Sequence, residues 1–474
     1  MNNIVFLVVP TNVSVNFINE NQFNGIPLSL IYLAGSIKNI CDKVEFFDFN
    51  VRRNSLELFE EKLNELMPFC VGINCLFSGL FKEVLAISEF VKKVLPQSKV
   101  VIGGMHPTIF AQEIMENCKC IDAVVLGEGE IAFPLLLKEY LENQNIININ
   151  NLDSVVIRGG GEVIKIPKTN YIENLDSLKP DYELLCLKDY EKNTEKWFDP
   201  NNIKISAVQM PILTSRSCPN SCNFCSMRFV MGDKIRFRTA ENVFAEIKML
   251  YENYGINYFK IIDDNFSYNK KRTLEICDMI VKSNIKIAME FPNGLMVKTL
   301  DREIIDALCL SGSIIFSLAI ESGSDYIRNT IMRKNCSKKL IFDAIQNLRK
   351  HNVRIFAFFM IGLPEETVET IDDTVNMINN LDIDYAFMSI VNPFPGTALY
   401  NQCKRDKLFT SMFDEYKLWN NTSKIHKNIS VGLDFFPIRP YNLSLEVLEK
   451  KYTELCTMIE LKNKNWDDHV AKST

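Results

Sequence analysis

The chain has 474 residues and a mass of 54.6 kDa, which is more than a single hydrophobic core of roughly 250 to 300 residues accommodates. Apolar residues make up 47% and charged residues 24% of the sequence, so global disorder is excluded and we expect more than one globular domain. The net charge of −6 has the wrong sign for a protein that follows a long phosphate backbone, so we expect no nucleic-acid partner.

The first residues, MNNIVFLVVPTN, predict a buried strand rather than a signal peptide, because the apolar run has no basic flank and no cleavage site. No stretch of the sequence approaches the roughly 20 apolar residues that span a bilayer. We therefore expect a cytoplasmic protein without a membrane partner. In a reducing compartment, the 14 cysteines point to metal ligation or catalysis rather than to disulfides.

Residues 1–142 alternate short apolar runs with helical patterns, of which the clearest runs from Phe81 to Leu95. This alternation predicts an α/β fold with a parallel, doubly wound, Rossmann-like sheet. Ligands bind such a sheet beyond the carboxyl ends of its strands. The expected strands are Ile4 to Val9, Val44 to Phe47, Cys70 to Ile73, Val100 to Ile102 and Ala123 to Leu126, and the candidate loops are Pro10 to Asn12, Asn74 to Gly79, Gly103 to Thr108 and Gly127 to Glu130.

Residues 143–205 break this rhythm and predict a linker with a small β-excursion. A second series of strands and helices over residues 206–400 predicts a partial (β/α)6 barrel. Residues 401–474 predict a small C-terminal helical region that ends in a helix from Ser444 to Leu461. The expected barrel strands lie near residues 210–214, 257–262, 286–291, 314–320, 354–361 and 385–391.

The strongest chemical signal is CPNSCNFC, which places Cys218, Cys222 and Cys225 at spacings of four and three residues. Three thiolates on one loop can hold three irons of a cubane cluster and leave the fourth iron open to a small molecule. A zinc site is the alternative, but zinc usually takes a fourth ligand from paired Cys or His. No such pair lies nearby in the sequence, so we predict an iron–sulfur cluster.

This cysteine motif, with Phe224 before its third cysteine, resembles the signature of the radical S-adenosylmethionine (SAM) superfamily. The loop TSRSCPNSCNFCS is similar to that of the superfamily's cobalamin-dependent branch, with Ser217 in place of the usual glycine. The phrases FKIIDDNFSYN, AIESGS, FFMIGLPEET and NPFPGTALY follow in the order typical of this family. The resemblance implies a radical SAM barrel with a [4Fe-4S] cluster that chelates SAM. The residues it implies at the SAM site are Phe224, Asp264, Asn265, Glu321, Ile361 and Gly362.

The segments IPLSLIYLAGSI, INCLFSGLF, GGMHPT and LGEGE resemble the cobalamin-binding domain that is fused to this branch. The motif Asp-x-His-x-x-Gly, whose histidine ligates cobalt in other cobalamin proteins, is missing, so we expect cobalt without a histidine lower ligand. A degenerate Rossmann domain that binds nothing is the alternative. The resemblance implies that cobalamin contacts come from Ser78, Gly103, Gly104, His106, Thr108, Gly127, Glu128 and Gly129.

Taken together, the resemblance implies a cobalamin-dependent radical SAM enzyme. We expect a methyltransferase that acts through a 5′-deoxyadenosyl radical on an unactivated carbon or a phosphorus centre of a small molecule. The expected partners are that substrate and an electron donor such as flavodoxin or ferredoxin. Cyclisation or another rearrangement in the same branch, and a cobalamin or redox sensor, stay open as alternatives. Tyr416, Trp419, Asn420 and His426 are candidate substrate contacts.

Overall fold

The computed structural model describes residues 2–10, 25–51, 56–76, 78–143, 147–192, 203–411, 413 and 436–472. These residues form two compact units. The N-terminal unit runs to Tyr190 and also includes Met227–Gly232, and the C-terminal unit comprises the other described residues. Each unit is described by itself below.

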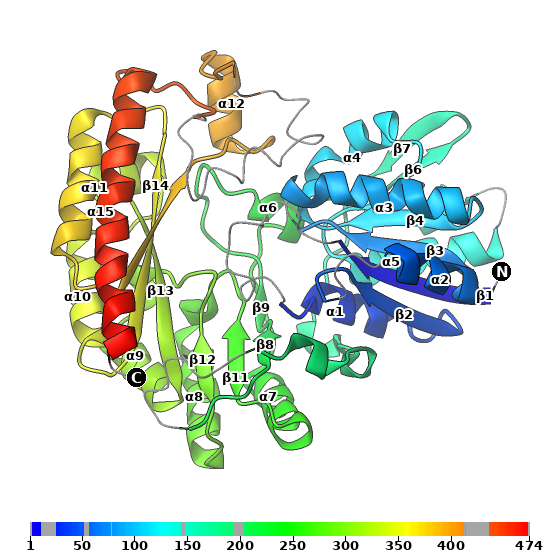
Figure 1. The fold of residues 1–474 in the computed structure, drawn as a ribbon, viewed down its shortest axis with the longest axis horizontal. Coiled ribbons are helices and arrows are strands. Elements are labelled where there is room, and N and C mark those ends of the chain that lie inside the picture. Colours follow the sequence, from blue (N-terminus) through cyan, green and yellow to red (C-terminus); the bar gives the residue numbers. More distant parts are fainter. Residues whose placement is uncertain are drawn as a thin grey trace. The chain divides into compact units, whose positions relative to one another are not determined.

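The N-terminal unit contains a seven-stranded sheet with the order β2-β1-β3-β4-β5-β6-β7 (Figure 1). Its first five strands are parallel, as the alternating pattern predicted. The strands are β1 (Asn2–Val9), β2 (Lys43–Asp48), β3 (Pro68–Asn74), β4 (Lys99–Gly103), β5 (Ala123–Val125), β6 (Val155–Gly159) and β7 (Glu162–Ile166), and the helices are α1 (Leu28–Ile37), α2 (Leu56–Leu66), α3 (Phe81–Val94), α4 (Met105–Asn117), α5 (Gly129–Glu142) and α6 (Met227–Met231).

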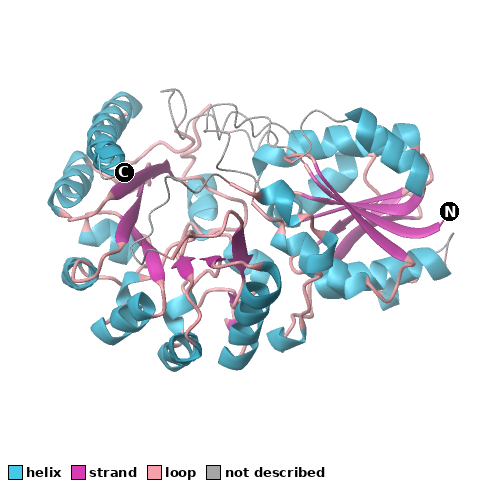
Figure 2. Cartoon of the chain, turned by 60° about the horizontal axis from the view of Figure 1, so that its bottom comes forward, coloured by secondary structure: helices cyan, strands magenta, loops and turns pink. Residues whose placement is uncertain are grey.

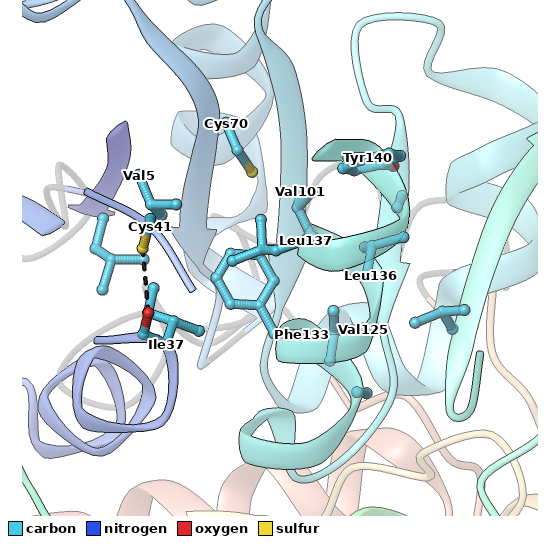
Figure 3. Close-up of a cluster of buried hydrophobic side chains, with 14 of the residues drawn as sticks. Val5, Ile37, Cys41, Cys70, Val101, Val125, Phe133, Leu136, Leu137 and Tyr140 are labelled. Carbon is cyan, nitrogen blue, oxygen red and sulfur yellow. Dashed lines mark hydrogen bonds between the residues drawn. The ribbon is translucent and has the colours of Figure 1, made fainter. Parts of the chain in front are cut away.

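Helices pack against this sheet and bury its central strands. Every residue of the central strand β3 is buried, which is the expected result for a parallel strand covered on both faces. Figure 3 shows Phe133 and Leu137 of α5 directed toward Val101 of β4. In the same cluster, the Cys41 thiol donates a hydrogen bond of 3.2 Å to the Ile37 carbonyl. This cysteine therefore belongs to the core.

The segment predicted as a linker with a small β-excursion over residues 143–205 contains a β-hairpin in its described part, and this hairpin joins the sheet of the N-terminal unit. Strands β6 and β7 form an antiparallel hairpin, and β6 pairs with β5 in the register Val125↔Val155. Residues Val155 to Ile157 are buried. The hairpin covers an otherwise open strand edge, so the N-terminal unit extends beyond the expected boundary at residue 142.

The C-terminal unit contains six parallel strands in chain order, β8-β11-β12-β13-β14-β15. Its helices lie outside the curved sheet (Figure 2), which is the expected partial barrel. The strands are β8 (Gln209–Ile212), β11 (Tyr258–Ile261), β12 (Ala288–Glu290), β13 (Ser313–Glu321), β14 (Arg354–Ile361) and β15 (Tyr385–Ile390), with the short pair β9 (Ser215–Arg216) and β10 (Arg236–Phe237), and the helices are α7 (Ala240–Tyr254), α8 (Lys270–Ser283), α9 (Arg302–Leu310), α10 (Lys338–Leu348), α11 (Val368–Asn380), α12 (Ala398–Arg405) and α15 (Leu445–Lys472).

Helix α7 illustrates how the local sequence sets these elements. The Thr239 side chain accepts a hydrogen bond from the Asn242 N–H, which caps the first turn. Val243, Ile247 and Leu250 are buried at helical spacing. Gly255 ends the helix with a φ of 67°, a conformation that costs glycine little.

Helix α15 closes the outer edge of the barrel sheet. It extends to Lys472, beyond the end expected at Leu461. The Asn463 side chain accepts a hydrogen bond from the Ala386 N–H and donates one to the Ala386 carbonyl, both 3.1 Å long. These two bonds replace those that a further strand would make to β15. Among the described residues, no helix has the length and apolar character that crossing a membrane requires.

Candidate functional site

The three motif cysteines lie on the loop that follows β8 and β9. Cys218, Cys222 and Cys225 are half-buried thiols, and the Cys225 N–H donates to the Cys222 carbonyl across 3.3 Å. Burial raises the pKa of Cys218 and of Cys222. Cys218 also interacts electrostatically with each of the other two thiols. The loop therefore carries all three cysteines of the motif as partly buried thiols, and their role as cluster ligands stays a prediction.

The donor chemistry of this loop fits a cluster better than a single ion. No group of three or more His, Cys, Asp or Glu side chains within the described ranges converges on a point where one metal ion would sit. A cubane makes no such demand, because each thiolate binds a different iron. The three half-buried thiols on one loop are therefore compatible with an iron–sulfur cluster.

The carboxyl end of β11 carries two acids with different surroundings. The Asp263 carboxylate accepts hydrogen bonds of 2.6 Å from the Thr214 N–H and the Ser215 hydroxyl, so it fastens the start of the cysteine loop to β11. The pKa of Asp264 is raised to about 6, chiefly by burial and then by the charge of Asp263. The Asp264 carboxylate accepts a backbone hydrogen bond from Ser217, and its contact with SAM stays a prediction.

The adjacent Asn265 has a buried acceptor without a partner. Its side chain is fully buried, and its Oδ1 atom accepts no hydrogen bond from the described residues. The same holds for Oδ1 of Asn223 on the cysteine loop, which the sequence analysis missed. Buried amide oxygens seldom stay unsatisfied. Both oxygens fit an N–H donor such as the amines of SAM.

Glu321 ends β13 in a left-handed conformation with a φ of 71°, which is uncommon outside glycine. Its carboxylate accepts a hydrogen bond of 2.8 Å from the Lys334 ammonium, and both side chains are 10% exposed. Burial alone would lower the pKa of Lys334, but the charges of Glu321 and Cys222 outweigh it, and the pKa is raised. The sequence analysis missed Lys334, because a lysine outside any motif is normally a surface residue.

The loop after β14 is held by a buried acid. The Gly362 and Leu363 N–H groups donate to the Glu366 carboxylate across 2.6 Å and 3.1 Å. Burial raises the pKa of Glu366 to about 7. Gly362 has a φ of 104°, and a Cβ there would lie 3.2 Å from the Phe436 ring. Ile361 is buried, so any contact it makes to adenine would come from its backbone.

Phe224, the aromatic residue of the cysteine motif, is half-buried. It packs against a hydrophobic cluster that includes Leu363 and Ile438. The cluster therefore joins the cysteine loop to the loop after β14 within the C-terminal unit. The role of Phe224 in binding adenine stays a prediction.

In the N-terminal unit, the predicted glycines approach the chain's own backbone. A Cβ at Gly104, which has a φ of 115°, would lie 2.5 Å from the Cys75 carbonyl oxygen. A Cβ at Gly127 would lie 2.5 Å from the Val230 carbonyl oxygen of α6. At Gly103 and Gly129, the nearest atoms are side-chain carbons at 3.7 Å and 3.1 Å. The positions of Gly104 and Gly127 are thus explained without a ligand.

The other predicted cobalamin contacts bind one another or neighbouring loops. Ser78 Oγ lies 2.8 Å from His106 Nδ1. The Thr108 hydroxyl donates to the Gly104 carbonyl and accepts from the Gly127 N–H, across 2.7 Å and 2.8 Å. The buried Glu128 carboxylate accepts a bond of 3.3 Å from the Ile172 N–H.

His106 lies inside the N-terminal unit. It is 1% exposed, and its ring lies between Phe81 and Phe110, with centroids 4.7 Å and 4.9 Å away. A direct contact with cobalamin would require this side chain to leave its packing. The candidate substrate contacts Tyr416, Trp419, Asn420 and His426, and the loop residues Thr11 and Asn12, lie outside the described residues.

Two family models match the chain. The B12 binding domain matches residues 17–137, and the Radical SAM superfamily matches residues 212–378. The chain therefore combines a B12-binding domain with a radical SAM domain. This confirms the predicted α/β fold class and enzyme class. It also confirms the predicted cofactors, which are a [4Fe-4S] cluster, SAM and cobalamin.

Two relatives and one solved structure are similar to this chain. An uncharacterized methyltransferase from Pyrococcus horikoshii is 29% identical over 90% of each chain. An anaerobic magnesium-protoporphyrin IX monomethyl ester cyclase from Cereibacter sphaeroides is 26% identical over 85% of this chain and 63% of its own length. The structure of the radical SAM methyltransferase TsrM from Kitasatospora setae matches with a TM-score of 0.69 and 15% identity, covering 95% of this chain and 82% of that one. The last similarity shows a shared fold.

Proposed function

We propose that the protein is a cobalamin-dependent radical SAM methyltransferase that methylates an unactivated carbon or a phosphorus centre of a small molecule. The proposal rests on the presence of both matched domains in one chain. The similarity of this chain to a methyltransferase covers 90% of each sequence. A cytidylyl-2-hydroxyethylphosphonate methyltransferase from Streptomyces wedmorensis, 26% identical over 72% of this chain and 68% of its own length, supports a phosphorus-containing substrate class.

When bound, the cluster with SAM supplies a 5′-deoxyadenosyl radical, and cobalamin supplies the transferable methyl group. In this proposal Cys218, Cys222 and Cys225 hold the cluster as thiolates. The unsatisfied Asn265 Oδ1 accepts a hydrogen bond from the SAM amine. Asp264 offers a carboxylate to the cationic ligand, and Glu321 accepts hydrogen bonds from its ribose hydroxyls.

The N-terminal unit would hold cobalamin at the loops beyond the carboxyl ends of β3, β4 and β5, where ligands bind in doubly wound sheets. The packing of His106 between two phenylalanines supports cobalt without a histidine lower ligand, because the ring is buried and lies 2.8 Å from Ser78 Oγ. The proposed reaction also needs a substrate and a source of electrons. We propose a small-molecule substrate, a flavodoxin or ferredoxin as electron donor, and a cytoplasmic location.

The proposal can be tested on the full chain, purified without oxygen and reconstituted with iron, sulfide and hydroxocobalamin. Incubation with SAM and titanium(III) citrate should yield both 5′-deoxyadenosine and S-adenosylhomocysteine, measured by mass spectrometry. The Cys222→Ala variant should yield no 5′-deoxyadenosine. Neither product above background would contradict the proposed enzyme class.

Cyclisation or rearrangement is the second candidate, and the similarity to the cyclase from Cereibacter sphaeroides favours it. Such a reaction consumes no SAM methyl group. Formation of 5′-deoxyadenosine without S-adenosylhomocysteine would therefore contradict methyl transfer and support this alternative.

A further inference from the structure

Lys334 is a buried cation beside the cysteine loop. Its residue is 9% exposed, and its ammonium makes an ion pair of 2.8 Å with Glu321. It also interacts electrostatically with the thiols of Cys222 and Cys218. A lysine is seldom buried without a partner. This one has the Glu321 carboxylate on one side and the cluster thiols within electrostatic range.

The backbone around Lys334 is built to hold it there. The fully buried Arg328 side chain donates to the Ser322 carbonyl across 2.5 Å and to the Cys336 carbonyl across 2.6 Å. The Lys334 N–H donates to the Arg328 carbonyl across 3.0 Å. Arg333 and Asn335, on either side of Lys334, have φ values of 61° and 52°. Non-glycine residues adopt such values at a cost, so the loop conformation is specified.

The charges of the site explain why a cation is useful in this place. Three thiolates give an oxidised [4Fe-4S] cluster a net negative charge, and reduction by one electron adds one further negative charge. An ammonium group in a partly buried site interacts more strongly with such charge than it would in water. The net charge around a cluster is one of the factors that set its reduction potential.

We propose that Lys334 raises the reduction potential of the cluster, with Glu321 as the counter-charge that positions its ammonium and moderates its effect. The inference rests on the cluster in the proposed function and adds a role for residues of this chain. Lys334 stabilises the reduced cluster, and Glu321 opposes that stabilisation. If the ion pair were purely structural, removing either partner would disturb the same loop. The two variants would then not shift the reduction potential in opposite directions.

The test is a mediated redox titration of the anoxically reconstituted full chain without SAM, followed by electron paramagnetic resonance. Lys334→Met should shift the midpoint potential to a more negative value, and Lys334→Arg should restore it toward wild type. Glu321→Gln should shift the potential to a more positive value. Lys270→Met is the matched control, because it breaks an exposed ion pair of 2.5 Å with Asp301 and should leave the potential unchanged.

Opposite shifts from Lys334→Met and Glu321→Gln support the proposal. Shifts of the same sign, or unchanged potentials in variants with full iron content, overturn it while leaving the cluster assignment intact. If Lys334→Met binds less iron, the sign of the Glu321→Gln shift decides alone: a positive shift supports the proposal, and a negative or absent shift overturns it. A wild-type chain that takes up no iron would instead contradict the proposed function.

Discussion

The groups in the strand-end loops make different kinds of contact in the two units. In the N-terminal unit, the groups expected to face a ligand contact the chain itself: Gly104 lies against the Cys75 carbonyl, and the Thr108 hydroxyl bonds two loops together. In the C-terminal unit, polar groups at the strand ends are buried but incompletely satisfied, as Asn265 Oδ1 shows. Glycine permits close approach to any backbone, whereas an unsatisfied buried acceptor points to a missing donor.

The C-terminal unit therefore carries the stronger local signs of a bound ligand. The C-terminal unit has local features that a ligand would explain: unpaired amide oxygens, a carboxyl with a pKa of about 6 at Asp264 and a left-handed Glu321. The loops of the N-terminal unit form a closed framework in their described part. A ligand there is inferred from the family match and the fold, and its contacts stay predictions.

The largest effect should come from the cysteine loop. Cys222→Ala should abolish the iron–sulfur absorbance and nearly all bound iron, because a cluster held by three thiolates loses one of its protein ligands. Cobalamin retention should remain, since Cys222 lies in the C-terminal unit. The matched control is Cys186→Ala, which removes an exposed free thiol and should leave iron content unchanged. Full iron content in Cys222→Ala would refute the assignment.

Gly104→Val tests the closed framework of the N-terminal unit. A Cβ at this position would lie 2.5 Å from a backbone oxygen at a φ of 115°, so we expect a loss of about 3 kcal/mol or more in the free energy of unfolding. Urea denaturation followed by circular dichroism measures it. Gly103→Ala is the control, because its Cβ would meet only ordinary contacts at 3.7 Å. A stable Gly103→Ala variant that loses cobalamin would place a ligand against this loop.

Glu366 tests how burial constrains a strand-end loop of the C-terminal unit. Its pKa is raised from 4.5 to about 7, so the folded chain favours its protonated form. Its contribution to stability is fully present below pH 4.5 and is lost as the pH rises through about 7. This loss is on the order of 3 kcal/mol. Glu366→Gln should remove that pH dependence from the free energy of unfolding, and parallel profiles for variant and wild type would contradict it.

Thr108→Val should have the smallest effect. It removes the two hydrogen bonds that join the Gly104 and Gly127 loops, which costs about 1 to 2 kcal/mol in the free energy of unfolding. Thr457→Val on α15 is the control, because its hydroxyl bonds only to the Thr453 carbonyl of its own helix. If Thr108→Val kept its stability and lost cobalamin, the hydroxyl would contact the ligand rather than the framework.

The fold was largely predictable from sequence, because positions that are buried at a regular spacing carry apolar residues at the same spacing. Strand β14 alternates buried and half-buried residues, and α3 runs from Phe81 to Val94 where the apolar spacing placed a helix. The pairing of β6 with β5 was missed, because the sequence around a strand does not show which other strand pairs with its edge. Helix α15 was predicted too short because the regular apolar spacing ends at Leu461, although no glycine or proline follows to end the helix.

The site was predictable where chemistry fixes the spacing, as in the cysteine motif. Lys334 could not be found, because its burial depends on hydrogen bonds to Arg328 and on an ion pair with Glu321, which lies thirteen residues earlier in the chain. The glycines of the N-terminal unit show a second limit of prediction from sequence. A glycine in a sequence indicates a close neighbour, but only the structure shows that the neighbour of Gly127 is the Val230 carbonyl.

The central claim is that three thiolates leave one iron of a cluster open to SAM. Electron paramagnetic resonance of the reduced, anoxically reconstituted chain, recorded before and after addition of SAM, tests it most directly. The account predicts the signal of a reduced [4Fe-4S] cluster whose g values change when SAM binds the open iron. A signal that SAM leaves unchanged, or a silent protein that contains zinc, would contradict it.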